Sequence, residues 1–513
     1  MEASPLEPVG PLDAALLAME TPEVLLHVAT LVVLERPADG RPVPAERLIG
    51  LVEERLPLVP RYRQRVLEAG LPAGLAPSAF WVEDPDFDLA YHVRVSALPA
   101  PGTEEQLLAH CARVLSRPLD RSRPLWELYV IEGLEHGRTA LFAKSHHAMI
   151  DGMEGVDLIT VMLEDDDGPA GIAPSTAAPP SAGRPRPLPT SAELARASME
   201  ALVARPGAIL ERLRAASRAP SRTLRRAVAI GVSAASVVRS RLLAPAPASL
   251  INRGPGRHRR LAVERLALAD VKAVKDAFST TVTDVVLAVV SDAVGRYLRD
   301  HGARTDGLWL RVLVPVSRSE DAEEHRLRSS VVGVIVELPM AEMDPVERLR
   351  ACRGAMADVR DRHGAVGAGF LLGLDEFAPP TLHALAARLA TDARVFNLAV
   401  VNVPGPQRAL ACAGLRLVAA FPFTSLPPGQ ALGIGVTSID GALDVGLTAD
   451  YDALPDVATI TDGLVVALAE LVACAGAVAA PRDATGRAPR ASRAVSPQPP
   501  PDAPAAVPGR ADA

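Results

Sequence analysis

The chain has 513 residues, of which 49% are hydrophobic and 22% are charged, so it can bury a large core and is too long for one ordinary domain. Its formal net charge of -7 argues against a nucleic-acid binder, because such proteins carry an excess of basic side chains that neutralise phosphates. Its four cysteines lie far apart without a C-x-x-C pair, which favours a reducing cytoplasm over a disulfide framework or a zinc site.

Strand and helix patterns alternate from the start of the chain. The β-branched run from Val24 to Leu34 predicts a buried strand, and the following pattern predicts a helix over 46–56. Thr103-Glu104-Glu105-Gln106 matches a capping box, which predicts a helix that runs to about residue 115. Strands are then expected over 126–132 and 139–144. The first ten residues have neither a basic nor an apolar region, so no secretory signal is expected.

The composition changes near residue 165. Residues 168–190 are rich in Pro, Ala, Ser and Gly without periodicity, which is typical of a linker. Nine arginines and one acid follow between Arg205 and Arg241, and this basic amphipathic pattern fits either a solvated crossover helix or contact with anionic lipid or phosphates. We therefore expect an N-terminal domain over 1–165, a linker and Arg-rich crossover over 166–250, a C-terminal domain over 251–480 and a disordered tail over 481–513.

The C-terminal domain also mixes helix and strand. Helices are expected from Asp270 and over about 283–301, and an alternating strand over 308–314. Asp440-Gly441 lies between two β patterns and favours a tight hairpin. The stretch over 464–480 is Ala-rich and interrupted by Glu470, so a packed helix is expected there rather than a membrane span.

One cluster carries chemical content: Lys144-Ser145-His146-His147-Ala148-Met149-Ile150-Asp151-Gly152, between a predicted strand and a predicted helix. An alcohol cannot ionise in advance near neutral pH, whereas a neutral imidazole can accept its proton while the alcohol attacks a thioester. The thiol of the thioester leaves readily, so neither a metal nor an enzyme nucleophile is required. Asp151 is interpreted as a brace for the loop, and Gly152 as the residue that permits a tight turn. The alternatives are a metal-binding fragment and a structural histidine pair.

At this point the chain resembles the bacterial wax ester synthase/diacylglycerol acyltransferase family, within the wider HHxxxDG group. The resemblance extends over roughly residues 11–470. Its other blocks are Pro11-Leu12-Asp13-Ala14, Glu20-Thr21-Pro22, Arg123-Pro124-Leu125-Trp126-Glu127, Phe396-Asn397-Leu398, Asn402-Val403-Pro404-Gly405-Pro406, Pro428-Gly429-Gln430-Ala431-Leu432 and Gly446-Leu447-Thr448-Ala449-Asp450.

The resemblance implies an α/β fold of two chloramphenicol-acetyltransferase-like domains with mixed sheets and an interdomain tunnel that reaches the motif. It implies a catalytic set of His147, His146 and Asp151, in which His147 is the general base. Structural residues at the site are Gly152, Trp126 and Asp284. For Trp126, a place in a buried strand face is favoured over direct contact with substrate.

The implied substrates are a long-chain acyl-CoA and either diacylglycerol or a fatty alcohol, without a cofactor or a metal. The implied location is the cytoplasm, at the periphery of membranes or lipid droplets. Backbone amides at Gly152 and Met153 are candidate oxyanion donors, because a helix is expected to begin there.

Two blocks depart from the family pattern. Thr283-Asp284 stands where the family has Asn-Asp, and Arg328-Ser329-Ser330 where it has Gly-Asn-Arg. We expect Thr283 to cap a helix, a role in which Thr nearly matches Asn. The departures keep two alternatives open: acyl transfer to another lipid, polyketide-type or carrier-bound alcohol, and a catalytically weak scaffold that binds lipid surfaces.

Overall fold

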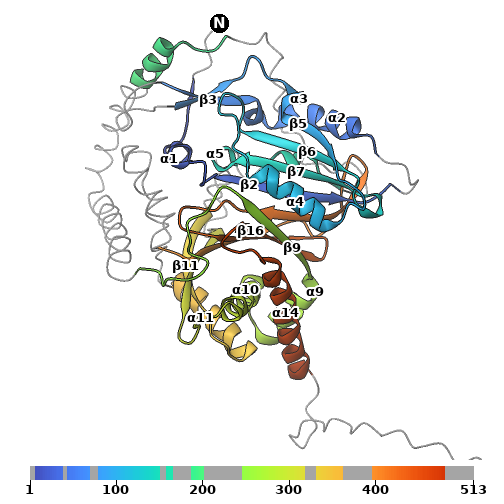
Figure 1. The fold of residues 1–513 in the computed structure, drawn as a ribbon, viewed down its shortest axis with the longest axis vertical. Helices are drawn as coiled ribbons and strands as arrows, with labels where there is room; N and C mark the ends of the chain where they lie inside the picture. Colours follow the sequence, from blue (N-terminus) through green and yellow to red (C-terminus); the bar gives the residue numbers. More distant parts are fainter. Residues whose placement is uncertain are drawn as a thin grey trace, which may run out of the picture.

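The computed structural model describes residues 6–37, 43–69, 79–150, 157–165, 187–200, 245–317, 331–361 and 395–479. Two α/β halves are stacked, with the N-terminal half above the C-terminal half in Figure 1. The N-terminal half contains a seven-stranded and a three-stranded sheet, and the C-terminal half contains a six-stranded sheet. The expected fold class, a mixed α/β chain with mixed sheets, is confirmed.

The seven-stranded sheet carries the functional motif. In spatial order its strands are β5 (Val93–Ala97), β6 (Trp126–Glu132), β7 (Thr139–His146), β2 (His27–Leu34), β14 (Leu415–Phe423), β13 (Leu410–Cys412) and β8 (Glu164–Asp165). The β5–β6 pair is parallel, and the other neighbouring pairs in this sheet are antiparallel. Side chains therefore alternate between two buried faces.

Each face of this sheet has its own hydrophobic core. Leu107, Cys111 and Leu115 of helix α4 (Glu104–Leu115) pack on the face that points toward the C-terminal half. Helix α2 (Ala45–Arg55) packs on the other face through Leu48 and Val52. The remaining elements of the N-terminal half are β1 (Glu7–Pro8), α1 (Pro11–Met19), β3 (Gln64–Glu68), β4 (Ala79–Glu83), α3 (Leu89–His92), α5 (His147–Ile150), α6 (Leu158–Met162) and three short 3-10 turns at Leu56–Leu58, Pro60–Arg63 and Glu135–Gly137.

The local sequence signals predicted several of these elements correctly. The capping box of α4 is present: Thr103 Oγ1 accepts from the Gln106 amide at 3.3 Å, and Gln106 Oε1 accepts from the Thr103 amide at 2.9 Å. Strand β6 has the expected bounds. Strand β7 runs two residues beyond the predicted end, because the pairing of His146 with His27 keeps it extended.

The C-terminal half is built on a six-stranded sheet. In spatial order its strands are β11 (Val331–Pro339), β10 (Trp309–Ser317), β12 (Leu398–Pro404), β15 (Leu432–Ile439), β16 (Ala442–Asp450) and β9 (Arg259–Ala267). The packed helices are α9 (Leu268–Phe278), α10 (Val282–Asp300), α11 (Pro345–Asp361) and α14 (Ala458–Ala479). Asp440 and Gly441 have φ of 46° and 75° and close the β15–β16 hairpin, which confirms that prediction.

The late part of the chain contributes two strands to the sheet of the N-terminal half. Strands β13 and β14 belong to the predicted C-terminal domain over 251–480, yet they extend the N-terminal sheet beside β2. Figure 1 shows this late, orange part of the chain within the upper body. The boundary near residue 165 therefore does not separate two independent sheets, because β14 completes the sheet that carries the motif.

Helix α14 is long and apolar enough to span a membrane, since Ala458–Val478 has a mean hydropathy of 1.8. One side of the helix packs into the C-terminal core through Leu464, Leu468 and Leu471. Its Glu470 accepts hydrogen bonds from Arg296 at 2.7 and 2.8 Å. The same length and composition occur in core helices of soluble proteins, and this packing fits that expectation.

The expected cap of α10 was wrong by two residues. The helix begins at Val282, and Thr281 rather than Thr283 is its N-cap. Thr281 Oγ1 accepts from the Asp284 amide at 3.1 Å, and Asp284 Oδ2 accepts from the Thr281 amide at 2.9 Å. The reciprocal pair determines where the helix begins, so Thr283 lies inside the first turn.

We expect Thr281→Ala to lower the free energy of unfolding by about 1 kcal/mol, because the Asp284 amide loses its acceptor. Thr283→Ala is the matched control and should change it by less than about 0.5 kcal/mol. Urea unfolding of both variants measures the difference. A larger loss for Thr283→Ala would contradict the observed cap.

Asp444 of β16 joins the two halves from within the core. Its side chain is fully buried, Oδ2 accepts from the Ala420 amide of β14 at 2.8 Å, and Oδ1 lies 3.4 Å from Arg265 Nε. Burial raises the pKa of Asp444 to about 6, although the Ala420 amide and Arg265 favour the charged form. The folded state therefore binds this proton more tightly than the unfolded state does.

When a carboxyl group has a higher pKa in the folded than in the unfolded state, the folded protein loses stability as the pH rises. The loss occurs between the pKa of the unfolded state, about 4, and that of the folded state. We expect Asp444→Asn to lack this loss, so the variant should gain roughly 3 kcal/mol relative to the native protein between about pH 4 and pH 7. Urea unfolding over this pH range, with Asp306→Asn as an exposed control, tests the expectation. Parallel stability curves for native protein and Asp444→Asn would refute it.

Candidate active site

The HHxxxDG motif begins at the junction of β7 and α5. His146 is the last residue of β7, and His147 is the first residue of α5. The predicted strand-to-helix loop is therefore absent at the two histidines themselves. The His147 amide donates to Leu26 O at 2.9 Å, just before β2 begins, and this bond holds the junction against the neighbouring strand.

The two histidines have different surroundings. His146 is completely buried beside His27, with a ring-centroid distance of 5.9 Å, and its Nδ1 accepts from the Ala148 amide at 3.1 Å. Burial lowers the pKa of His146 to about 3, and Glu20 offsets part of that effect. A neutral, enclosed imidazole whose Nδ1 already accepts a hydrogen bond is suited to positioning rather than to proton transfer with a substrate.

His147 is the more accessible of the pair. Its side chain is only partly buried, and its Nδ1 is enclosed without an aligned hydrogen-bond partner among the described residues. A hydroxyl approaching this ring can therefore meet it at Nε2. One imidazole nitrogen within hydrogen-bond reach of an alcohol is the requirement for general-base catalysis.

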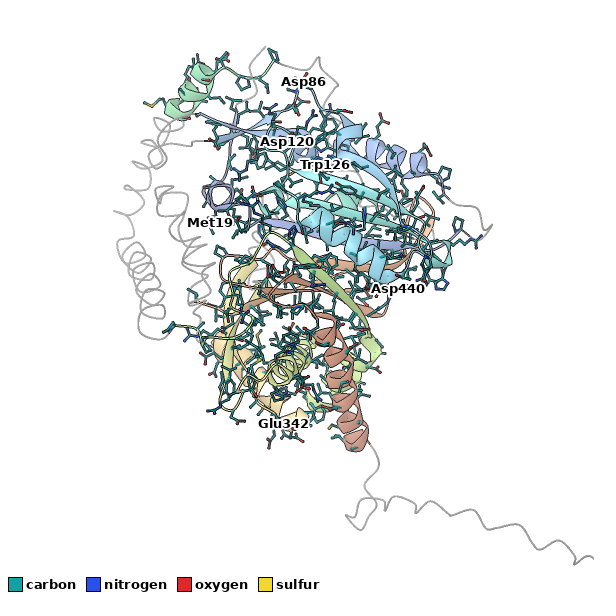
Figure 2. All side chains as sticks on the ribbon, in the orientation of Figure 1. Met19, Asp86, Asp120, Trp126, Glu342 and Asp440 are labelled. Carbon is teal, nitrogen blue, oxygen red and sulfur yellow. The ribbon has the colours of Figure 1, made fainter. Side chains whose placement is uncertain are left out.

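An aromatic cluster supports the motif from β6. Trp126 is buried with Leu128 and Val130, which confirms the expected strand face. Trp126 Nε1 donates to Tyr62 O at 2.7 Å, and the two rings meet edge to face at 5.2 Å. Figure 2 places Trp126 inside the upper body, among densely packed side chains. A structural role for Trp126 is consistent with these contacts.

Tyr62 lies at the site although no sequence signal pointed to it. Its hydroxyl accepts from the Leu158 amide of α6 at 3.1 Å, so it fixes the chain on the far side of residues 151–156. Burial raises the pKa of Tyr62, which keeps the phenol protonated. Its place depends on tertiary packing, because Tyr62 is distant in sequence from both the motif and Trp126.

A charged cluster surrounds His146 and His27. Glu20 Oε1 lies 2.9 Å from His27 Nε2, and Arg121 donates to Glu20 Oε2 at 2.6 and 3.1 Å. Lys144 is fully buried, and its ammonium donates to Val114 O at 3.1 Å. The family resemblance had included Glu20 without giving it a role, and the arrangement of opposite charges was not predicted.

The other predicted site residues are not all brought to His147. Asp151, Gly152 and Met153 lie outside the described residues, as do Ser329 and the Arg-rich 205–241 segment. Asp284 is buried at the start of α10 in the C-terminal half, where it forms the capping box with Thr281. Its predicted position at the site is therefore not supported by a contact to the motif among the described residues.

The cavities found in the described residues lie in the C-terminal half, away from His147. Two small cavities lie in the C-terminal half, one near Asp292 and Arg348 and one within the apolar core near Val289. Neither lies beside His147, so the interdomain tunnel remains a prediction. In the part of the chain that the structure describes, no group of three or more His, Cys, Asp or Glu side chains could hold a metal ion.

Comparison with known families decides the relationship of the chain. Residues 9–286 match the wax ester synthase/diacylglycerol acyltransferase catalytic domain, and residues 330–472 match the C-terminal domain of the same family. The chain belongs to the wax ester synthase/diacylglycerol acyltransferase family. The resemblance found from the sequence blocks is thereby confirmed, and the protein is an acyltransferase of this type.

Relatives in mycobacteria match nearly the whole chain. A Mycobacterium tuberculosis protein named as a diacylglycerol O-acyltransferase is 31% identical over 91% of this chain and 91% of its own length. A second protein of that organism with the same designation is 33% identical over 91% of this chain and 100% of its own length. A Mycobacterium bovis relative is 32% identical over 91% of this chain and 99% of its own length.

Solved structures share the fold. The wax ester synthase/diacylglycerol acyltransferase from Marinobacter aquaeolei VT8 has a TM-score of 0.62 and 26% identity, covering 91% of this chain and 100% of that chain. The first condensation domain of the calcium-dependent antibiotic synthetase has a TM-score of 0.54 at 17% identity, covering 94% and 98%. The second likeness supports the fold alone.

Proposed function

We propose that this acyltransferase esterifies diacylglycerol with a long-chain acyl-CoA, forming triacylglycerol, and that it also accepts long-chain alcohols to form wax esters. The mycobacterial relatives are named for transfer to diacylglycerol, and the Marinobacter relative for both activities. The observation that carries the site assignment is the difference in burial between the two histidines. His146 is enclosed, whereas His147 is only partly buried.

The proposed reaction uses His147 as a proton carrier. Its Nε2 accepts the hydroxyl proton while the alcohol oxygen attacks the thioester carbonyl. The tetrahedral intermediate then collapses, the carbon–sulfur bond breaks, and the imidazolium returns the proton to the CoA thiolate. An ester and free CoA result, so atoms and charges balance without a cofactor or a metal.

The burial of His146 supports the assignment of proton transfer to His147. A histidine that acts as a base must be unprotonated at the working pH and must reach the substrate. His146 satisfies the first condition but is completely buried, and its Nδ1 is occupied by the Ala148 amide. His147 is the member of the pair whose ring is partly exposed. Asp151 and Gly152 complete the motif in sequence, with Asp151 as the expected brace.

The substrates also suggest where the protein works. Diacylglycerol and long-chain alcohols reside in membranes or lipid droplets, so we infer a cytoplasmic enzyme that acts at the periphery of such surfaces. The Arg-rich 205–241 segment is the sequence feature that would contact anionic lipid. Flotation of the purified protein with anionic but not with neutral vesicles would indicate electrostatic attachment. No flotation with either kind of vesicle would indicate that such attachment is absent.

The proposed activity is tested by CoA release from a long-chain acyl-CoA with dioleoylglycerol, hexadecanol or no acceptor. We expect release to depend on an acceptor and the corresponding triacylglycerol or wax ester to appear in lipid extracts. If no CoA is released with either acceptor, the result would contradict the proposal and favour a different alcohol or the scaffold alternative. Equal release without an acceptor would indicate thioester hydrolysis instead of transfer.

A further inference from the structure

We propose that Glu20 is a positioning residue of the acyl-transfer site: its carboxylate orients the imidazoles of His27 and His146, so that His146 caps the short helix that begins with His147. The inference rests on the proposed role of His147 as general base. Glu20 itself acts through its neighbours and not on the substrate.

The Glu20 carboxylate connects three elements of the N-terminal half. Its Oε1 lies 2.9 Å from His27 Nε2 in β2, and its Oε2 lies 3.8 Å from His146 Nε2 in β7. Arg121 donates to Oε2 and also to Leu17 O at the end of α1. His27 and His146 are paired across β2 and β7, so a single carboxylate faces both rings.

These contacts determine the protonation of all three groups. Burial alone would raise the pKa of Glu20, yet His27 and Arg121 outweigh it and hold this pKa at about 2. Burial lowers the pKa of His27 to about 4 and that of His146 to about 3. Near neutral pH an ionised carboxylate therefore faces two neutral imidazoles.

An ionised carboxylate can only accept hydrogen bonds, so it selects the tautomer of each ring. A nitrogen lone pair 2.9 Å from a carboxylate oxygen would be repelled, and His27 therefore carries its proton on Nε2. His146 has the same tautomer, because its Nδ1 must be unprotonated to accept the Ala148 amide. Its Nε2 then carries the proton and lies 3.8 Å from Glu20 Oε2, an electrostatic contact beyond hydrogen-bond distance.

The tautomer of His146 affects the helix that presents His147. The early amides of a helix have no partner within the helix, and a side chain at the N-cap commonly accepts one of them. His146 precedes α5 and its Nδ1 accepts from the amide of Ala148, the second residue of α5. A proton on Nδ1 would remove this acceptor and release the turn that begins with His147.

The surrounding charges make Glu20 the necessary anion of this cluster. Lys144 and Arg259 both act on His27 electrostatically, and Arg121 lies directly against the carboxylate. The buried Glu127 pairs instead with Lys144, whose ammonium lies 3.9 Å from Glu127 Oε2. Among the described residues, Glu20 is the acid whose charge acts on both imidazoles.

The C-terminal half holds the Glu20 segment in place. Arg259 at the start of β9 is buried, and its Nη2 donates to Glu23 O at 2.7 Å. The Arg259 amide donates to Ser116 Oγ at 2.9 Å, at the end of α4. The segment between α1 and β2 is therefore fixed to the motif at one end and to the neighbouring half at the other. In Figure 2 the labelled Met19 lies beside this junction.

The first test compares Glu20→Gln, Glu20→Asp and Glu23→Gln in the full-length protein. We expect Glu20→Gln to lower kcat about tenfold to a hundredfold while the KM for acyl-CoA changes little, because small displacements of a catalytic group have effects of this size. Glu20→Asp keeps the charge and should recover part of kcat. Glu23→Gln removes an exposed acid of the same segment and should leave kcat unchanged. An unchanged kcat in Glu20→Gln would overturn the proposal.

The second test observes the imidazoles directly by 15N NMR of histidine-labelled protein. In the native protein, His146 should show an unprotonated Nδ1 and a protonated Nε2, and Glu20→Gln should shift this balance. Loss of kcat in Glu20→Gln with an unchanged His146 tautomer would reduce Glu20 to a merely structural residue and refute the proposal. Because this readout needs no turnover, it also separates failure of the positioning role from failure of the proposed acyltransferase substrates.

Discussion

His147→Ala should lower kcat/KM for acyl transfer by about a hundredfold to ten-thousandfold, the usual contribution of a positioned general base. The hydroxyl of the acceptor would then have to lose its proton to water, which the partly enclosed site restricts. Binding of acyl-CoA should change little, because the imidazole acts on the alcohol and not on the donor. The measurement is acceptor-dependent CoA release under saturating and limiting acyl-CoA.

His258→Ala is a suitable control for this variant. His258 is exposed in the C-terminal half, and its ring contacts Tyr451 edge to face at 6.2 Å. Its loss should leave acyl transfer unchanged. Both variants should unfold at nearly the temperature of the native protein, which separates lost chemistry from lost structure. Acceptor-dependent release that persists in His147→Ala would show that another group is the base.

Gly446→Ala should destabilise the contact between the two halves. Gly446 of β16 lies directly opposite Gly435 of β15, and the Pro422 carbonyl of β14 lies above both. A Cβ at Gly446 would be 2.3 Å from Pro422 O, and one at Gly435 would be 2.4 Å from the same atom. Backbone atoms cannot rotate away as a side chain can, so β14 would have to move.

We expect Gly446→Ala to lower the free energy of unfolding by about 1–3 kcal/mol, the range for overpacking in a core. Thermal unfolding should shift by about 1 °C for each kcal/mol, because the entropy of unfolding grows with the length of the chain. Since β14 pairs with β2, acyl transfer should also fall through displacement of the strand that carries His27.

Gly50→Ala is the matched control for Gly446→Ala. Gly50 is exposed within α2, and a Cβ there would meet nothing within 4 Å. Alanine should increase stability by about 0.5–1 kcal/mol, because glycine loses more backbone entropy in a helix. If both variants behaved alike, the close approach of Pro422 would not constrain the fold.

Local signals in the sequence determined much of the fold. The Thr103 capping box and the Asp440-Gly441 hairpin depend on interactions between neighbouring residues, so composition and spacing were sufficient to find them. The apolar residues Trp126, Leu128 and Val130 likewise located β6. The HHxxxDG motif is contiguous, and with the family blocks it identified an acyltransferase and its candidate base, His147, without a structure.

The tertiary structure decided what depends on residues far apart in the chain. Adjacent residues at the end of a strand enter different surroundings, so only the packing of β7 distinguished enclosed His146 from accessible His147. Three contacts arise from long-range pairing. Glu20 lies near His146, the Tyr62 hydroxyl binds the Leu158 amide of α6, and β14 inserts beside β2. Such contacts leave no periodic pattern, because each depends on the burial and charge of a partner that the local sequence does not contain.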